Sequence, residues 1–547
     1  MLLVGVNAKY IHSNLAIRYF SKIDSRFSFC EFNISGRPES IAAALYKTGA
    51  KTFLFSCYIW NIEHVLKICE ILKKAEPAIC IALGGPEVSF DAKERLACCD
   101  YIDFILTGEG ETSISAFADA LANGDFSTVP GLYYRKKGTV VQSLVPPKEA
   151  DLNEIPFPYE EADIKNLANR IVYYETSRGC PYRCAFCLSG AAGSLRFLPV
   201  ERVEKELAFF EKQGVPLVKL VDRTFNADPD RALAIIEGIK RRGGKTTYHF
   251  EIRAESMTSA LIQSLSEAPM GMFQLEIGVQ STQPETLKAI CRNPQHDRLV
   301  EVVSALSKNQ NMHLHLDLIA GLPGESLEEF IHSFHDVMKL RPHNLQLGFL
   351  KRLKGSTLSA PGSEFWSFPP YEVIHSDAMS YEELLFLKQV EEMLERYYNS
   401  GAFSKTIRYI LEHYYAGREF DFFADMAAYI GGDTAPKSQK AAFEELYRFS
   451  QSKWQENAIT DCLIYDYCLR HRDSLSFMKS GDGLKAQAFE FLKQPERVSQ
   501  YFVNYAGEKP VVLYKKIRFV PIGIRIFAFD YEGGRAVDVT KEFKLEE

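Results

Sequence analysis

The stretch Gly179-Cys180-Pro181-Tyr182-Arg183-Cys184-Ala185-Phe186-Cys187 holds three cysteines in the spacing C-x-x-x-C-x-x-C, shortly after an apolar run at residues 171–174. Three thiolates that converge from one short loop form a soft-metal site, and a cuboidal iron–sulfur cluster normally takes four such ligands. Three ligands leave one iron open, and an open coordination position is typical of a metal that does chemistry. Two structural interpretations stand beside this one: a zinc knuckle with a distant fourth ligand, and three buried thiols.

This motif resembles the cluster-binding loop of radical S-adenosylmethionine (SAM) enzymes. The resemblance implies that Cys180, Cys184 and Cys187 hold a [4Fe-4S] cluster and that the amino and carboxylate groups of SAM fill the vacant iron site. In that family the aromatic residue before the third cysteine, here Phe186, lies against the adenine. A reductant protein such as flavodoxin or ferredoxin is implied as the electron donor.

Bulk composition is that of a globular protein with several domains. The chain has 547 residues, of which 46% are apolar and 25% charged, with a formal net charge of -7. This charge gives no general basic field for nucleic acid or anionic lipid. No run is long and apolar enough for a membrane span, and the N-terminus lacks the features of a signal peptide, so we expect a cytoplasmic protein. The nine cysteines outside the triplet show no second metal spacing and are interpreted as small buried hydrophobes.

Residues 1–135 alternate short apolar runs with amphipathic segments, which predicts a doubly wound, Rossmann-like parallel sheet with helices on both faces. The predicted strands are residues 2–6, 52–56, 79–83 and 104–106, and the clearest helices are residues 61–75 and 112–123. Ligands bind such sheets at the carboxyl ends of the strands.

The loops at those strand ends include Gly84-Gly85-Pro86-Glu87 and Gly108-Glu109-Gly110-Glu111, and together they resemble the cobalamin-binding domain that precedes the radical domain in a large subgroup of these enzymes. The resemblance implies cobalamin contacts at Asn7, Ser56, Tyr58, Gly84, Gly85, Glu87, Gly108, Glu109 and Gly110. The D-x-H-x-x-G loop of many cobalamin proteins is missing, since Asn7 and Lys9 stand where its Asp and His would be. Cobalamin bound without a protein imidazole is favoured over a degenerate domain, and His12 is not favoured as a ligand.

Residues 136–169 are rich in turn signals and are interpreted as a linker. Residues 170–360 resume the strand and helix alternation, with predicted strands at residues 171–174, 217–221, 248–252, 273–277, 313–318 and 345–350. Six such units with the metal loop after the first predict a partial (β/α)6 barrel, whose active site lies at the C-terminal face of the strands.

Polar residues at those strand ends are candidates for SAM contacts. Asp222 is the candidate for the methionine ammonium, with a helix cap as the alternative, and Arg253 is the candidate for its carboxylate. Glu251, Arg253 and Glu255 alternate, so they share one face of a strand, and the other interpretation is a salt-bridge row facing the outer helices. The resemblance further implies contacts at Glu276, Gln280 and Ser281 on the ribose-binding strand, at Ile319 in the element Asp317-Leu318-Ile319-Ala320-Gly321-Leu322-Pro323-Gly324-Glu325, and at Leu350 at the end of the last strand.

Residues 361–547 are predicted to form a mainly helical domain that ends in a small β element at residues 509–540. They contain no chemical motif, and they resemble a domain of unassigned function appended to one branch of these enzymes. A structural role is the expected one.

The resemblance implies a function through the chemistry of the cofactors. A 5′-deoxyadenosyl radical from SAM would remove a hydrogen atom from an unactivated carbon, and methylcobalamin would then deliver a methyl group to that carbon. The alternatives are cyclisation, rearrangement or another redox outcome without methyl transfer, a non-catalytic cobalamin or metal sensor, and a zinc-stapled binding protein. A small molecule or a peptide is favoured over nucleic acid as the substrate, and the sequence predicts neither the substrate itself nor the oligomeric state.

Overall fold

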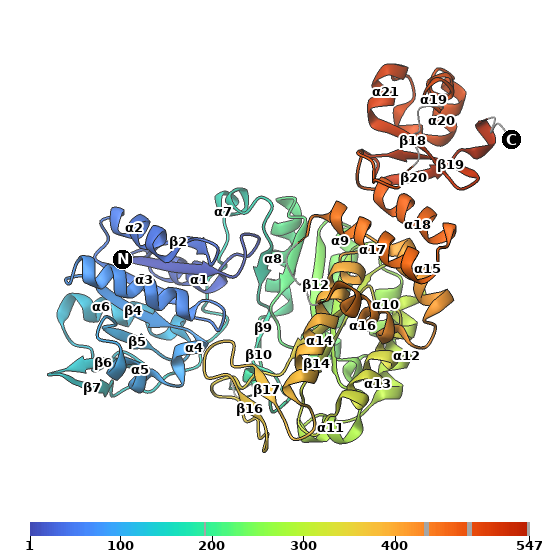
Figure 1. The fold of residues 1–547 in the computed structure, drawn as a ribbon. Coiled ribbons are helices and arrows are strands. Elements are labelled where there is room, and N and C mark those ends of the chain that lie inside the picture. Colours follow the sequence, from blue (N-terminus) through green and yellow to red (C-terminus); the bar gives the residue numbers. More distant parts are fainter. Residues whose placement is uncertain (191–192, 432–436, 479–483, 544–547) are drawn as a thin grey trace. The chain divides into compact units, whose positions relative to one another are not determined.

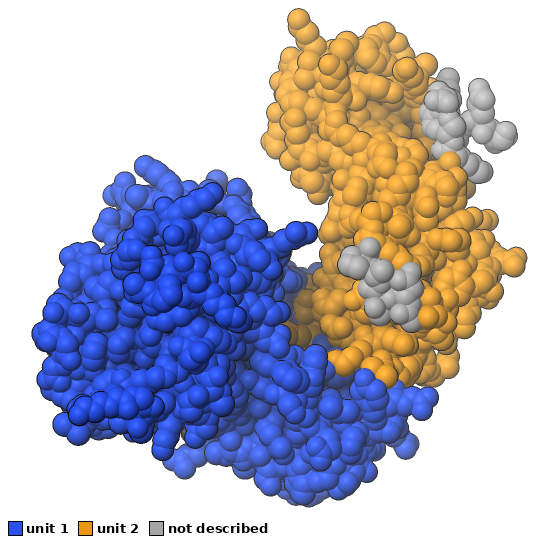
Figure 2. Space-filling model, turned by 60° about the vertical axis from the view of Figure 1, so that its left-hand side comes forward, with its two compact units in different colours: residues 1–333, 347–384 blue, residues 334–346, 385–547 orange. Residues whose placement is uncertain are grey.

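The computed structural model describes residues 1–190, 193–431, 437–478 and 484–543. The chain forms two compact units, Met1–Ser333 with Leu347–Leu384, and Phe334–Gln346 with Leu385–Glu547 (Figure 2). The first unit contains both the N-terminal sheet and most of the barrel. Within the described residues, no helix combines the length and the low polarity needed to cross a bilayer.

The N-terminal sheet has seven strands in the order β2-β1-β3-β4-β5-β6-β7 (Figure 1). Its strands are β1 (Leu2–Asn7), β2 (Ser28–Asn33), β3 (Thr52–Ser56), β4 (Cys80–Gly84), β5 (Phe104–Leu106), β6 (Leu132–Lys136) and β7 (Thr139–Gln142). The first five pair in parallel, and β6 and β7 extend the sheet as antiparallel strands. The four predicted strands are present within one residue at each end, while β2, β6 and β7 were not predicted.

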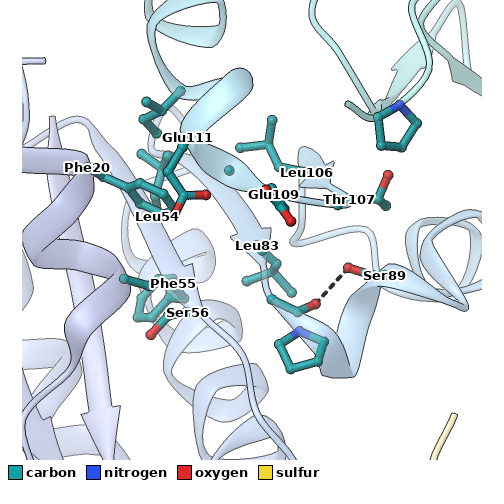
Figure 3. Close-up of a pocket in the computed structure, with 18 of the residues that line it drawn as sticks. Phe20, Leu54, Phe55, Ser56, Leu83, Ser89, Leu106, Thr107, Glu109 and Glu111 are labelled. Atoms are coloured by element: carbon teal, nitrogen blue, oxygen red, sulfur yellow. Dashed lines mark hydrogen bonds between the residues drawn. The ribbon is translucent and has the colours of Figure 1, made fainter. Parts of the chain in front are cut away.

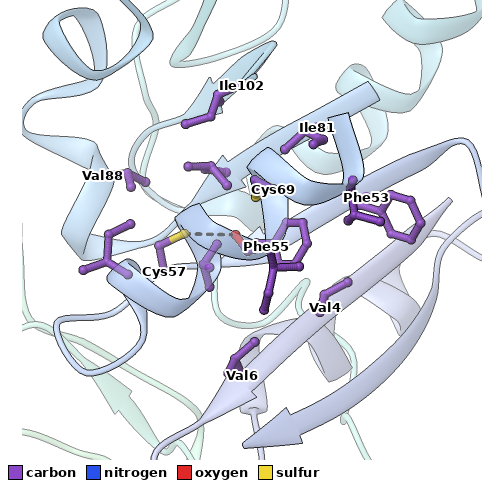
Figure 4. Close-up of a cluster of buried hydrophobic side chains, with 14 of the residues drawn as sticks. Val4, Val6, Phe53, Phe55, Cys57, Cys69, Ile81, Val88 and Ile102 are labelled. Carbon is purple, nitrogen blue, oxygen red and sulfur yellow. Dashed lines mark hydrogen bonds between the residues drawn. The ribbon is translucent and has the colours of Figure 1, made fainter. Parts of the chain in front are cut away.

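Helices cover both faces of this sheet, as the doubly wound fold requires. They are α1 (Leu15–Ile23), α2 (Pro38–Lys47), α3 (Ile62–Ala75), α4 (Pro86–Ser89), α5 (Ala92–Cys98) and α6 (Ile114–Asn123). Successive residues of a strand point to opposite faces, so Val4 packs in one core cluster with Phe53, Phe55 and the residues of α3 (Figure 4). Leu3 packs in the other cluster, which includes residues of α1 and α6.

The segment predicted as a linker is packed on the rest of its unit. It contributes β7 to the N-terminal sheet and contains helix α7 (Glu161–Asn166). After it, the backbone N–H of Ile171 donates to the carbonyl of Ile11 at 2.8 Å, and the Ser13 hydroxyl donates to the carbonyl of Ile171 at 3.0 Å. His12 Nδ1 lies 2.6 Å from the hydroxyl of Tyr173. The loop after β1 is therefore joined by hydrogen bonds to the first strand of the barrel.

The second sheet has six strands in the order β15-β14-β13-β12-β11-β8, which is the order of a partial barrel. These strands are β8 (Val172–Tyr174), β11 (Leu217–Leu220), β12 (Thr247–Ile252), β13 (Phe273–Gln280), β14 (His313–Ala320) and β15 (Asn344–Phe349). The helices between them are α8 (Val200–Lys212), α9 (Pro229–Arg242), α10 (Ser259–Ser266), α11 (Pro284–Ala289), α12 (His296–Ser307) and α13 (Leu327–Met338). All six predicted strands are present, with shifts of up to three residues at their ends.

The interior of this barrel is polar. Along β13 the buried residues alternate with half-buried ones, and the half-buried set is Gln274, Glu276, Gly278 and Gln280. The same alternation on β14 gives His313, His315, Asp317 and Ile319. Branched apolar side chains fill the interior of most (β/α) barrels, so this interior is suited to contact polar groups.

The C-terminal region is mainly helical, as predicted. Its helices are α14 (Tyr381–Met393), α15 (Ser404–Tyr414), α16 (Glu419–Ile430), α17 (Gln439–Lys453), α18 (Asn457–Cys468), α19 (Lys485–Leu492), α20 (Pro495–Tyr501) and α21 (Pro510–Lys516). A three-stranded antiparallel sheet follows, with β18 (Ile517–Ile522), β19 (Arg525–Asp530) and β20 (Arg535–Asp538). The β element predicted from residue 509 thus begins later, because residues 510–516 form a helix.

Replacing Phe210 by Ala should lower the free energy of unfolding by about 3–5 kcal/mol, the usual loss for a fully buried aromatic side chain. Phe210 of α8 is inaccessible to solvent, and its ring centroid lies 5.5 Å from those of Phe157 and Tyr159 and 5.6 Å from that of Tyr174. Urea unfolding of the two proteins measures the difference. The neighbouring and half-buried Phe209 is the matched control, and equal losses for the two substitutions would contradict this packing.

Candidate functional site

The cysteine loop is closed at its base by a short hairpin. Strand β9 (Ser177–Arg178) leads into the loop, and β10 (Arg196–Phe197) pairs with it in antiparallel fashion. Gly179 has a φ of +91°, and a Cβ there would collide with the backbone carbonyl of Ser194. Only glycine fits this sharp exit from β9. Cys180 therefore follows directly, at the start of the loop that joins the two strands of the hairpin.

Each of the three cysteine sulfurs has a polar neighbour. The Sγ of Cys180 lies 3.5 Å from the Thr224 hydroxyl, the Sγ of Cys184 lies 3.9 Å from Arg253 Nη1, and the Sγ of Cys187 accepts from the backbone N–H of Ser189 at 3.4 Å. All three thiols are free and half-buried. Hydrogen bonds to sulfur and nearby positive charge are the usual surroundings of an iron–sulfur cluster, so these residues fit one. Among the described residues, no three Cys, His, Asp or Glu side chains are grouped around a single-ion site.

Phe186 and Ala185 lie inside the loop with different surroundings. Phe186 is half-buried beside Cys187, whereas Ala185 is buried and donates its N–H to the carbonyl of Ile290 at 3.0 Å. The predicted contact of Phe186 with adenine stays a prediction.

Asp222 has a structural role rather than the predicted ligand position. Its side chain is 0% exposed, and its carboxylate accepts hydrogen bonds from the Thr176 N–H at 2.7 Å, the Thr176 hydroxyl and the Ser177 N–H at 3.0 Å. A carboxylate without exposed surface has no access to a ligand. It does not cap helix α9 either, since Asp228 does so. Asp222 instead anchors the segment that enters the cysteine loop.

Arg253 lies beside the cysteine loop. Its guanidinium stacks over the Tyr182 ring at 3.8 Å and pairs with Glu255 at 3.2 Å. Strand β12 ends at Ile252, so Arg253 and Glu255 lie in the loop after it and the predicted alternation with Glu251 stops there. The predicted contact of Arg253 with the methionine carboxylate stays a prediction.

Glu276 belongs to a network inside the barrel. Its Oε2 accepts from Lys219 Nζ at 2.9 Å and lies 2.8 Å from His249 Nε2. Burial alone would raise its pKa, but the hydrogen bond with His249 and the charge of Lys219 lower the pKa to about 2. The carboxylate is therefore ionised and occupied by protein groups, which leaves less capacity for the ligand contact predicted for it.

The end of β13 has an irregular backbone. The pairing with β14 shifts between Gly278 and Gln280, and Gln280 has a φ of +73°, which is uncommon for a residue with a side chain. The next residue, Ser281, is 2% exposed and donates to the buried carboxyl of Glu325, whose pKa burial raises to about 8. Ser281 thus fixes the strand end from within the core, and it has no exposed hydroxyl for the predicted ligand contact.

The two apolar residues predicted to contact SAM, Ile319 and Leu350, differ in their exposure to solvent. Ile319 is half-buried on β14, and its predicted ligand contact stays a prediction. Leu350 is 1% exposed, and its backbone N–H donates to the carbonyl of Ala320. Because its side chain is buried, only its backbone is available for the predicted ligand contact.

A cavity of about 720 Å³ lies at the carboxyl edge of the N-terminal sheet (Figure 3). Seven of the nine predicted cobalamin contacts line it: Ser56, Tyr58, Gly84, Gly85, Gly108, Glu109 and Gly110. Its floor is formed by the strand-end residues Leu54, Phe55, Leu83 and Leu106. An apolar floor with few polar groups is typical of a cofactor site.

Two predicted contacts lie outside this cavity. Asn7 donates from its side chain to Glu31 Oε1 at 3.1 Å and to the carbonyl of His12 at 3.0 Å. Glu87 is buried, accepts from the Tyr371 hydroxyl and pairs with Lys354 at 3.1 Å. Both side chains are occupied by structural partners.

Two glycines that line the cavity are required by close packing within the protein. Gly85 has a φ of +110°, and a Cβ there would lie 2.5 Å from the carbonyl oxygen of Cys57. A Cβ on Gly110 would collide with the ring of Phe20. Sequence reasoning missed the contributions of Ala16, Ile17 and Phe20 from α1, which became visible only once α1 was known to lie along this edge.

Salt bridges join the cavity to the cysteine hairpin. Arg178, the last residue of β9, pairs with Glu109 at 3.1 Å and with Glu111 at 2.9 Å, and Arg196 on β10 also pairs with Glu109. Leu188 and Gly193, which follow the third cysteine, line the same cavity. The two sites predicted separately from the sequence therefore share one wall.

Comparison with known families divides the chain into three parts. The models described as "B12 binding domain", "Radical SAM superfamily" and "Protein of unknown function (DUF4080)" match residues 1–118, 174–337 and 362–539.

Two curated relatives match part of the chain. A 2-(S-pantetheinyl)-carbapenam-3-carboxylate methyltransferase from Streptantibioticus cattleyicolor is 26% identical over 60% of this chain and 51% of its own length. The cobalamin-dependent radical SAM methyltransferase TokK from Streptomyces tokunonensis is 27% identical over 56% of this chain and 47% of its own length. The chain spans about half the length of these relatives.

The cobalamin-dependent SAM radical enzyme OxsB has a similar fold, with a TM-score of 0.59 at 16% identity over 82% of this chain and 75% of that one. The matches to the radical SAM and B12-binding models imply a [4Fe-4S] cluster, SAM and cobalamin as cofactors. The chain therefore contains, in order, a segment similar to a B12-binding domain, one similar to the radical SAM superfamily and one similar to a domain of unknown function.

Proposed function

We propose that this chain is a cobalamin-dependent radical SAM methyltransferase that methylates an unactivated carbon of a small molecule or peptide. The observation that carries the proposal is the shared wall, in which Glu109 at the cavity rim pairs with Arg178 and Arg196 on the two strands of the cysteine hairpin. Radical formation and methyl transfer must meet at one substrate, so the two cofactor sites need to be adjacent.

When bound, the cofactors supply a 5′-deoxyadenosyl radical and a transferable methyl group. The residues of the chain hold and orient these groups. Cys180, Cys184 and Cys187 would hold the cluster, and Arg253 would bind the methionine carboxylate, since a guanidinium forms strong hydrogen bonds with carboxylates. The relatives named above are methyltransferases, which supports the same reaction type.

The polar interior of the barrel supports a polar substrate. Lys219, Glu276 and His249 form a hydrogen-bonded network there, and Glu251 lies 3.9 Å from Lys219. Such groups can form hydrogen bonds with a polar substrate, whereas an apolar substrate would leave them without partners. A protein such as flavodoxin or ferredoxin would supply the electrons.

The reaction type is tested by product analysis under anaerobic conditions. The cluster-loaded chain is incubated with cobalamin, SAM, a strong reductant and a candidate substrate, and methylation predicts both 5′-deoxyadenosine and S-adenosylhomocysteine. Cyclisation, rearrangement or another redox reaction would give 5′-deoxyadenosine without S-adenosylhomocysteine. A non-catalytic sensor would give neither product.

Replacing Cys180, Cys184 or Cys187 by Ala should abolish cluster binding and the formation of 5′-deoxyadenosine, because each thiolate would hold a different iron. Iron and sulfide content and the visible absorbance of the reconstituted protein measure the loss. Cys98, an exposed cysteine on α5, is the matched control and should give wild-type iron content after replacement by Ala. Full cluster content in a triplet variant would contradict the assignment.

Replacing Ala16 by Phe should weaken cobalamin binding at least about tenfold, because the larger side chain fills space that the cofactor needs. Ala16 lies on α1 and lines the cavity, so its substitution leaves the strand-end glycines unchanged. Absorbance of cobalamin retained after gel filtration measures binding. Ala43, exposed on α2, is the control for the same substitution. Unchanged binding by Ala16→Phe would place cobalamin elsewhere.

A further inference from the structure

A short segment after helix α11 contacts both the cysteine loop and the end of strand β13. Its first residue, Ile290, accepts the backbone N–H of Ala185, which lies directly after Cys184. Cys291 has a φ of +58°, so the chain reverses there, and the N–H of Arg292 donates to the carbonyl of Leu287 at 2.8 Å. These contacts fix the backbone from which the Arg292 side chain extends.

The guanidinium of Arg292 is almost fully buried, at 8% exposure. Its Nη2 donates to the carbonyl of Gly278 at 2.8 Å and lies 3.9 Å from Glu255. An arginine keeps its charge when buried, although burial lowers its pKa here. Removing this charge from water costs free energy, so interactions with the groups around it must offset that cost.

One of these surroundings is the ion pair of Arg253 and Glu255 beside the cysteine loop. The Nη1 of Arg253 lies 3.9 Å from the Sγ of Cys184. Glu255 is the carboxylate that pairs with Arg253 and lies near Arg292. Two guanidiniums with one carboxylate leave a net positive charge beside a cluster ligand.

The other is the irregular end of β13. Arg292 holds the carbonyl of Gly278, at the start of the shift in pairing, and Ser281 is held from the core by Glu325. Gln280 lies between these two anchors in its left-handed conformation, and its amide side chain folds back over Gly278. A residue in a sparsely populated conformation persists only where its neighbours fix it.

We propose that Arg292 is a positioning residue that holds Gln280 at the end of β13 in register with the cysteine loop and adds a positive charge to the Arg253–Glu255 pair beside that loop. The proposal rests on the proposed function, because it concerns the same cluster and SAM site. Arg292 acts through Gly278 and the loop.

The test compares Arg292→Met with the wild-type protein after cluster reconstitution. We expect wild-type iron content and a more negative midpoint potential of the cluster, because the potential follows local charge. We also expect SAM binding to weaken by about tenfold to hundredfold. This range corresponds to the loss of one hydrogen bond to a charged group, here the bond from Arg292 to the Gly278 carbonyl that fixes the end of β13. Redox titration followed by electron paramagnetic resonance gives the potential, and the change of that spectrum on SAM addition gives the affinity. Neither readout requires turnover.

Two further variants separate charge from geometry. Arg292→Lys should restore most of the potential but little of the SAM affinity, because an ammonium keeps the charge without the planar fork. Arg298→Met removes a guanidinium on α12 that donates to the carbonyl of Met257 and pairs with Glu301, and it should change neither readout.

Wild-type potential and SAM affinity in Arg292→Met would overturn the proposal. Loss of the cluster in both Arg292 variants would also overturn it, since the residue would then serve only folding. Failure of the proposed function is a separate result: the wild-type protein would form no 5′-deoxyadenosine while the cluster potential and SAM binding remained measurable.

Discussion

The buried carboxylate of Asp222 is the constraint on which the site depends. It binds the backbone N–H groups of Thr176 and Ser177, the last turn of chain before the cysteine hairpin. Arg231 donates to the carbonyl of the same Thr176 at 2.9 Å, so donors and acceptors of this turn are both satisfied by charged groups. Hydrogen bonds to charged groups contribute about 1.5–3 kcal/mol each. With this turn fixed, the backbone enters the cysteine loop in one direction.

Arginines on the cysteine hairpin form salt bridges with the loop that follows β5 of the N-terminal sheet. Arg178 and Arg196 share Glu109, whose pKa is lowered, since burial is outweighed by the hydrogen bond from Arg196 and the charge of Arg178. A glutamate predicted as a ligand contact is therefore also the link between two domains. Arg292 also joins the loop to the barrel, since its neighbour Ile290 accepts the N–H of Ala185 while its guanidinium binds the carbonyl of Gly278 near the end of β13. Arginines thus connect the cysteine loop both to the N-terminal sheet and to the barrel.

Much of this could be predicted from the sequence, because strand periodicity and the cysteine spacing are local patterns. The six barrel strands and the cysteine triplet were predicted in this way, and so were the glycine turns of the cavity. Partners distant in sequence could not be predicted. Asp222 and Ser281 carry the right chemistry for ligand contacts, but Thr176 and Glu325 occupy them. Strand β2 was missed because its residues are only half-buried and Ser28, Glu31 and Asn33 interrupt its apolar pattern. Arg292 follows a short helix without any motif.

The hydrogen bonds between the loop after β1 and strand β8 bear on how the protein acquires its cofactors. Ile11 and Ser13 bind the backbone of Ile171, and His12 binds Tyr173, so the N-terminal sheet cannot swing away from the barrel without breaking them together. A hinge that opens to admit a large macrocycle is therefore costly. Phe90 lines the cavity and its side chain is exposed, so the cavity has an edge that a ligand could reach without that separation.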